Sequence, residues 1–142
     1  MDNFRDRKRP ASNFKLSDEV AQQQLATLLD HYDIYPGDFD DNDKRLYCSA
    51  CDGMIVAIRS GRVSIDKADK LTVTQTLKNG EKINYSEVDG RSRVQDKEQA
   101  SRSDRVFSMM GSLSGLGYSA ILGLKGTDLT TMNNLSFLLA SV

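Results

Sequence analysis

The chain has 142 residues, of which 39% are hydrophobic and 27% are charged, and its formal net charge is −1. This length is enough to bury a real core, and the balanced charge gives no general attraction to nucleic acid or to an anionic membrane. No apolar run reaches the ~20 residues of a membrane span, and the first residues lack the apolar core of a secretory signal. Two cysteines in such a chain indicate a reducing compartment, so we expect a cytoplasmic protein that binds neither nucleic acid nor membrane.

Residues 1–15 are charged, unpatterned and interrupted by Pro10, which predicts a flexible N-terminal arm. Four basic residues cluster in it, but two aspartates dilute them, so a solvated tail is favoured over a nucleic-acid contact. We expect residues 16–142 to form a single α+β domain.

Two helices are predicted in the first half of the chain, over residues 17–32 and 43–60, with an acidic loop between them. Ser17 or Asp18 can cap the first helix, and Gly61 is suited to end the second. Apolar side chains recur at three- and four-residue steps in both helices. They are Val20, Leu25, Leu28 and Leu29 in the first, and Leu46, Tyr47, Ala50, Cys51, Met54, Ile55 and Ile58 in the second.

Two groups of side chains here resemble metal or redox sites. Asp38, Asp40 and Asn42 have the spacing of the start of a calcium loop, but an aspartate replaces the glycine at its sixth position and a serine the glutamate at its twelfth. Cys48 and Cys51 lie inside a predicted helix with no preceding strand, whereas a reactive pair needs a helix N-terminus. A zinc site would need further ligands beyond the single histidine, His31. We therefore predict no metal site, favour packing for the cysteines, and keep a metal or redox module as an alternative.

The clearest structural signal is a β-hairpin over residues 71–88, with two β-branched runs around Asn79-Gly80. A two-residue turn would mix apolar and polar side chains on both faces. A three-residue loop over residues 78–80 pairs Val73 with Tyr85 and Gln75 with Ile83, and it collects the threonines on the opposite face. It also places Gly80 at the left-handed loop position, so we predict this bulged register. Residues 62–66 can add a third strand.

In the second half of the chain, the spacing of apolar residues predicts further helices over residues 99–114, 118–124 and 128–140. The expected fold is therefore α+β, with a hairpin or three-stranded meander (residues 62–66, 71–78 and 81–88) packed against four to five α-helices. Residues 115–120 fit a loose dinucleotide fingerprint, but they do not follow a strand. There is no Gly-x-Ser-x-Gly motif and no second histidine. We therefore predict a protein that is not an enzyme, has no catalytic residues and uses no cofactor.

Residues 71–142 resemble the small tail assembly chaperones of long-tailed bacteriophages. In that family a hairpin with a glycine turn leads through a charged stretch to a helix ending in Leu-x-Gly-Leu. A Leu-x-x-x-Asp-Leu element and a closing helix follow. The matching residues here are Leu77-Lys78-Asn79-Gly80-Glu81-Lys82-Ile83, Leu113-Ser114-Gly115-Leu116, Leu124 with Asp128-Leu129, and residues 132–139.

The resemblance implies a non-enzymatic protein that coats hydrophobic segments of the tape measure protein in the host cytoplasm before tail tube assembly. Short apolar helices cannot bury every face against one another, which leaves a groove for such a partner. The predicted partner-binding residues are Leu113, Leu116, Ile121, Leu124, Leu135 and Leu138. The alternative is a structural virion component, such as a head–tail connector or a baseplate protein, and self-association is left open.

Overall fold

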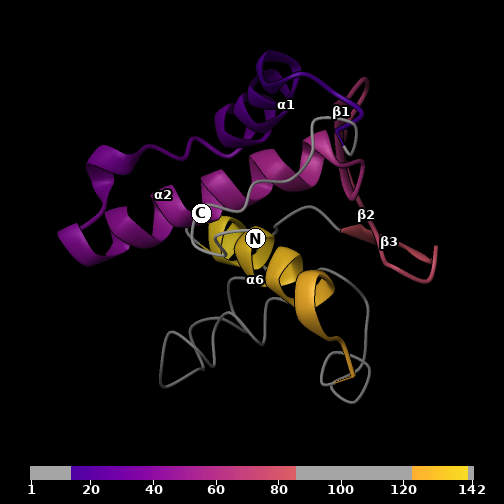
Figure 1. Ribbon diagram of the computed structural model, residues 1–142. Helices are drawn as coiled ribbons and strands as arrows, with labels where there is room; N and C mark the ends of the chain where they lie inside the picture. Colours follow the sequence, from indigo (N-terminus) through magenta and orange to yellow (C-terminus); the bar gives the residue numbers. More distant parts are fainter. Residues whose placement is uncertain (1–13, 86–122, 141–142) are drawn as a thin grey trace, which may run out of the picture.

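The computed structural model describes residues 14–85 and 123–140. This part of the chain contains three α-helices and a three-stranded antiparallel sheet around one apolar core (Figure 1), so the protein is α+β. In chain order the elements are α1 (Asp18–His31), the 3-10 turn η3 (Pro36–Asp38), α2 (Asp41–Arg59), β1 (Val63–Lys67), β2 (Leu71–Thr76), β3 (Lys82–Tyr85) and α6 (Gly126–Ala140).

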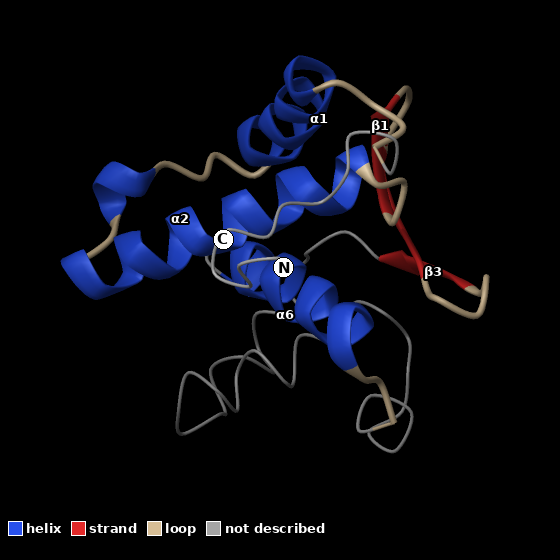
Figure 2. Cartoon of the chain, viewed as in Figure 1, coloured by secondary structure: helices blue, strands red, loops and turns tan. Residues whose placement is uncertain are grey.

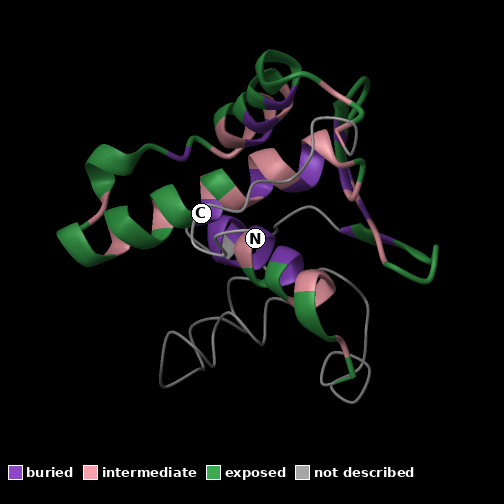
Figure 3. Cartoon of the chain, in the orientation of Figure 1, coloured by how far each residue is buried: buried purple, intermediate pink, exposed green. Residues whose placement is uncertain are grey.

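The helices form layers, with α2 between α1 and α6 and the sheet beside the C-terminal end of α2 (Figure 2). The crossing of α2 and α6 is close because Gly53 faces Asn134. A Cβ atom at Gly53 would overlap the side-chain amide of Asn134. Figure 3 shows that the buried residues of α2 and α6 lie toward the C-terminal ends of these helices, whereas the N-terminal half of α2 is largely exposed.

The ends of the first two helices follow local chemistry. The Ser17 hydroxyl accepts a hydrogen bond from the Val20 N–H (3.2 Å) and caps α1, as predicted. Gly61 has a φ of 79° and ends α2 in a left-handed conformation, also as predicted. The same type of ending follows α1, but there the left-handed residue is Asp33, with a φ of 56°.

The predicted hairpin register is confirmed. Val73 pairs with Tyr85 and Gln75 with Ile83. The Gly80 N–H donates to the Leu77 carbonyl (2.9 Å), and the Leu77 N–H donates to the Glu81 carbonyl (2.8 Å). This closes a three-residue loop, and Gly80 has a φ of 90° there, as the bulged turn requires. The predicted third strand is β1, which pairs antiparallel with β2.

One face of the sheet contributes to the core and the other meets solvent. Strand residues that alternate along β1, β2 and β3 are buried: Val63, Ile65, Leu71, Val73, Gln75, Ile83 and Tyr85. On the other face Thr72 is exposed and Thr74 half-buried, and the Thr74 hydroxyl donates to the Asn84 side chain (2.9 Å). The threonines of β2 therefore lie on the face opposite the core, as the predicted register requires.

Several expectations need correction. The described residues contain three α-helices rather than four to five. The predicted helix at 99–114 lies outside the described residues. So does most of the predicted helix at 118–124, and its last two residues, Gly123 and Leu124, are not helical. Val20 and Leu46 were expected on apolar faces, yet they are 39% and 41% exposed. Within the part of the chain described, none of the helices has the length and apolar character needed to cross a membrane.

The end of the predicted arm is attached to the fold. The N–H groups of Lys15 and Leu16 donate to the Arg59 carbonyl (2.7 and 3.2 Å), and the Arg59 guanidinium lies 4.0 Å from the centre of the Phe14 ring. The C-terminal end of α2 therefore holds residues 14–16, whereas residues 1–13 lie outside the described part.

Candidate functional site

A hollow of about 320 Å³ opens between the hairpin loop and the start of α6. We call it the hairpin–helix hollow. One wall comes from the loop (Leu77, Lys78 and Asn79), and the other from the segment that leads into α6 (Leu124, Lys125 and Asp128). Leu77 and Leu124 are both half-buried and pack against the core. The hollow therefore presents two apolar side chains to solvent.

Asp128 in the first turn of α6 holds the hairpin loop in place. Its carboxylate oxygens accept hydrogen bonds from the Lys78 N–H at 3.2 and 3.3 Å. An acidic side chain is also favourable at this position, because the first turn of a helix carries unpaired N–H groups and partial positive charge. One residue thus stabilises the beginning of α6 and fixes one wall of the hollow against the other.

Gln75 connects the sheet to α6 from the buried side. Its side-chain amide donates to the Asp128 backbone carbonyl (2.9 Å), and its amide oxygen accepts from the Tyr85 hydroxyl (2.7 Å). Gln75 is 1% exposed; its bond with Tyr85 is buried and its bond with Asp128 is partly buried. Burial also raises the pKa of the Tyr85 hydroxyl. Buried polar groups without partners are costly, which makes this arrangement specific. We refer to Gln75, Lys78, Tyr85 and Asp128 as the polar junction.

The described lining residues offer apolar and charged side chains. Among the described residues that line the hollow there is no histidine, cysteine or hydroxyl side chain. The Asn79 side chain is already engaged, because its oxygen accepts from the Glu81 N–H (2.9 Å). The chemistry that remains is apolar contact with Leu77 and Leu124 beside the charges of Lys78 and Lys125.

The six predicted partner-binding residues are distributed unevenly. Leu113, Leu116 and Ile121 lie outside the described residues. Leu124 lies in the hairpin–helix hollow. Leu135 and Leu138 are both 0% exposed and pack α6 into the core of the chain itself, so they present no surface to a partner.

Cys48 is exposed and Cys51 is half-buried one turn later in α2, and both thiols are free. Burial raises the pKa of the Cys51 thiol, although a hydrogen bond with Tyr47 lowers it somewhat. Burial, together with the nearby Cys51, also raises the pKa of Tyr47 to about 12. A protonated thiol is a poor nucleophile and a poor metal ligand. The geometry therefore favours packing for Cys51.

One carboxylate of the acidic loop caps a helix. The Asp40 carboxylate accepts a hydrogen bond from the Asp43 N–H (2.7 Å) and caps α2. Asp40, the second residue of the calcium-like spacing, therefore serves as a helix cap. His31 does not approach the cysteines as a ligand would, since no group of three His, Cys, Asp or Glu side chains within residues 14–85 and 123–140 could hold a metal ion.

Sequence reasoning missed most of the hollow. It identified Leu124, and it placed Asp128 in a helix first turn, but it did not connect either to the hairpin loop. The sequence does contain both the glycine turn and a Leu-x-x-x-Asp-Leu element. In the structure these two elements are in contact through Lys78 and Asp128.

Comparison of the chain with protein-family models, with curated proteins and with solved structures finds no match.

Proposed function

We propose that this chain is a non-enzymatic tail assembly chaperone of a long-tailed bacteriophage. In this proposal it binds hydrophobic segments of the tape measure protein in the host cytoplasm before the tail tube assembles. The observation that supports the proposal is the hairpin–helix hollow. It is formed by the two described elements that carry the family resemblance, and it offers partly exposed leucine side chains to a protein partner.

The physical properties of the hollow suit a temporary partner. Apolar contact contributes roughly 25 cal/mol per Å² of buried surface, so a small patch around Leu77 and Leu124 gives modest affinity per site. A long apolar partner would offer many such sites to many copies of the chaperone. Weak individual contacts would then be released when the tail tube replaces them.

The test is co-expression with the tape measure protein, which the proposal identifies as the long, helix-rich product encoded downstream of this chain. We expect the chain to increase the soluble fraction of that product. Leu124→Gln should abolish the increase, because it places a polar amide in the hollow. The matched control is Val20→Gln, which changes an apolar residue that is 39% exposed on α1. Equal solubility of the tape measure protein with and without this chain would refute the proposal.

A virion component would behave differently from a chaperone. A chaperone is expected to be absent from purified phage particles, whereas a connector or baseplate protein remains in them. Mass spectrometry of purified particles therefore separates the proposed function from its structural alternative.

A further inference from the structure

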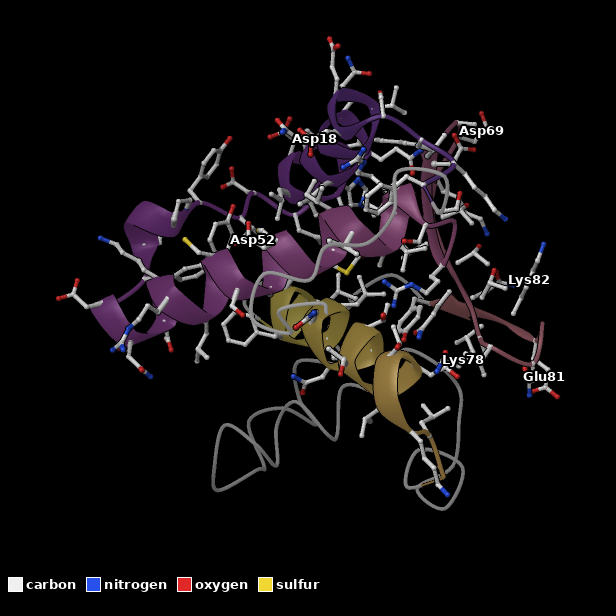
Figure 4. The ribbon with its side chains drawn as sticks, viewed as in Figure 1. Asp18, Asp52, Asp69, Lys78, Glu81 and Lys82 are labelled. Atoms are coloured by element: carbon white, nitrogen blue, oxygen red, sulfur yellow. The ribbon has the colours of Figure 1, made fainter. Side chains whose placement is uncertain are left out.

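The charges around the hairpin–helix hollow are arranged asymmetrically. Lys78 and Lys125 are exposed on its two walls, and within residues 14–85 and 123–140 neither ammonium forms an ion pair. Among the described lining residues the one carboxylate belongs to Asp128, and its oxygens already accept the Lys78 backbone N–H. Figure 4 shows Lys78 beside the first turn of α6, with Glu81 and Lys82 farther out on the hairpin. The unpaired charge that the described residues present to a ligand in the hollow is therefore positive.

We infer that the hairpin–helix hollow selects apolar protein segments that are flanked by acidic residues. A leucine or phenylalanine of the partner enters between Leu77 and Leu124, and Asp or Glu side chains next to it pair with Lys78 and Lys125. This inference rests on the proposed function, because it specifies the chemistry of the segment that the chaperone holds. It adds a preference that apolar contact alone does not provide.

Size and charge have separate roles in this selection. A volume of about 320 Å³ accepts a large side chain from a partner, but it lies near the lower limit for a small-molecule site. The apolar side chain supplies most of the affinity. Exposed ion pairs add little binding energy. Bringing like charges together is costly, however, so the charges of the hollow can discriminate between acidic and basic partners. Lysine stems can also cover apolar surface while the ammonium groups stay in water.

The experiment compares two fluorescent helical peptides in binding to the full chain. Both carry the same central pair of leucines, which are flanked by glutamates in one peptide and by lysines in the other. Fluorescence anisotropy is measured with wild type, with the double variant Lys78→Glu/Lys125→Glu, and with the control Lys67→Glu/Lys70→Glu. The control makes the same charge change on β1 and in the β1–β2 turn, where both lysines are exposed and outside the lining of the hollow.

We expect wild type to bind the glutamate peptide roughly tenfold more tightly than the lysine peptide, as two ion pairs and the removal of two repulsions allow. The Lys78→Glu/Lys125→Glu variant should reverse the preference, and the control should keep it. A reversed peptide preference can be explained only by side-chain charge in the hollow, because a misfolded variant would lose binding of both peptides. Equal binding of the two peptides, or binding of neither, would overturn the inference.

A second measurement separates this inference from the proposed function. The Lys78→Glu/Lys125→Glu variant is co-expressed with the tape measure protein. If wild type solubilises that protein and the variant does so equally well, the charge preference is wrong while the chaperone proposal stands. If wild type itself does not solubilise it, the chaperone proposal fails, and the peptide preference is judged from anisotropy alone.

Discussion

The helical layers and the polar junction are held together by different forces. In α2 and α6 the large buried side chains are mainly apolar, with Met54, Ile58, Met132, Leu135 and Leu138 all 0% exposed. Where the sheet meets α6, the contacts are directional hydrogen bonds through Gln75, Tyr85 and Asp128.

This difference indicates how the chain divides stability from specificity. Apolar burial supplies most of the folding free energy, but it is non-directional. Buried hydrogen bonds contribute less net energy, yet they are costly when broken and so favour one arrangement. The layers therefore keep the chain folded, and the polar junction sets the position of the hairpin loop relative to α6. The hairpin–helix hollow depends on that position.

The largest effect should come from the helical layers. Leu135→Ala removes a side chain that is 0% exposed, and we expect a loss of roughly 2–5 kcal/mol of unfolding free energy. Leu124→Ala, in the half-buried hollow, should cost only about 1 kcal/mol. Urea unfolding followed by circular dichroism measures both. Similar losses for the two variants would mean that the hollow belongs to the core.

The polar junction should be sensitive to substitutions that keep the shape of a side chain but remove its polar groups. Gln75→Leu leaves the Tyr85 hydroxyl and the Asp128 carbonyl without their buried partner, at a cost of roughly 1–3 kcal/mol. Tyr85→Phe removes one of the two bonds and should cost less. Urea unfolding of both variants gives the comparison. A Gln75→Leu protein as stable as wild type would show that apolar contact alone holds the sheet against α6.

The hairpin loop should show a smaller and purely backbone effect. Gly80 has a φ of 90° and open space around it, so Gly80→Ala should cost about 1 kcal/mol through conformational strain. Gly37→Ala is the matched control, because Gly37 also has open space but lacks a positive φ. Thermal unfolding compares the two. Equal midpoints would contradict the bulged loop.

The smallest effect concerns reactivity rather than stability. Exposed Cys48 should react with a thiol reagent well before half-buried Cys51, because burial both shields Cys51 and raises the pKa of its thiol. In Cys48→Ser only Cys51 remains to react. Its reaction should be slow at neutral pH and should accelerate as the pH rises, because the raised pKa of this thiol means that the reactive thiolate forms only at higher pH. Cys51→Ser should react quickly. Equal rates for the two cysteines would instead favour the redox alternative.

Local pattern was sufficient for the elements that depend on neighbours in sequence. The bulged register of the hairpin follows from face matching and from Gly80, and the ends of α1 and α2 follow from Ser17 and Gly61. Exposure on a helix was harder to predict. Val20 and Leu46 fit an apolar stripe, but the structure leaves both partly exposed, at 39% and 41%. The spacing of apolar residues along a helix does not show how far a neighbouring element covers that helix.

Local sequence pattern predicted the α+β class and the strand register, because these depend on side-chain period and on turn geometry. That Leu135 and Leu138 belong to the core while Leu124 lies in a hollow depends on how the elements pack. Packing also brings Asp128 to Lys78 across 50 residues of sequence. Periodicity describes one element at a time. A binding hollow depends on which elements meet, and packing of the whole chain sets that.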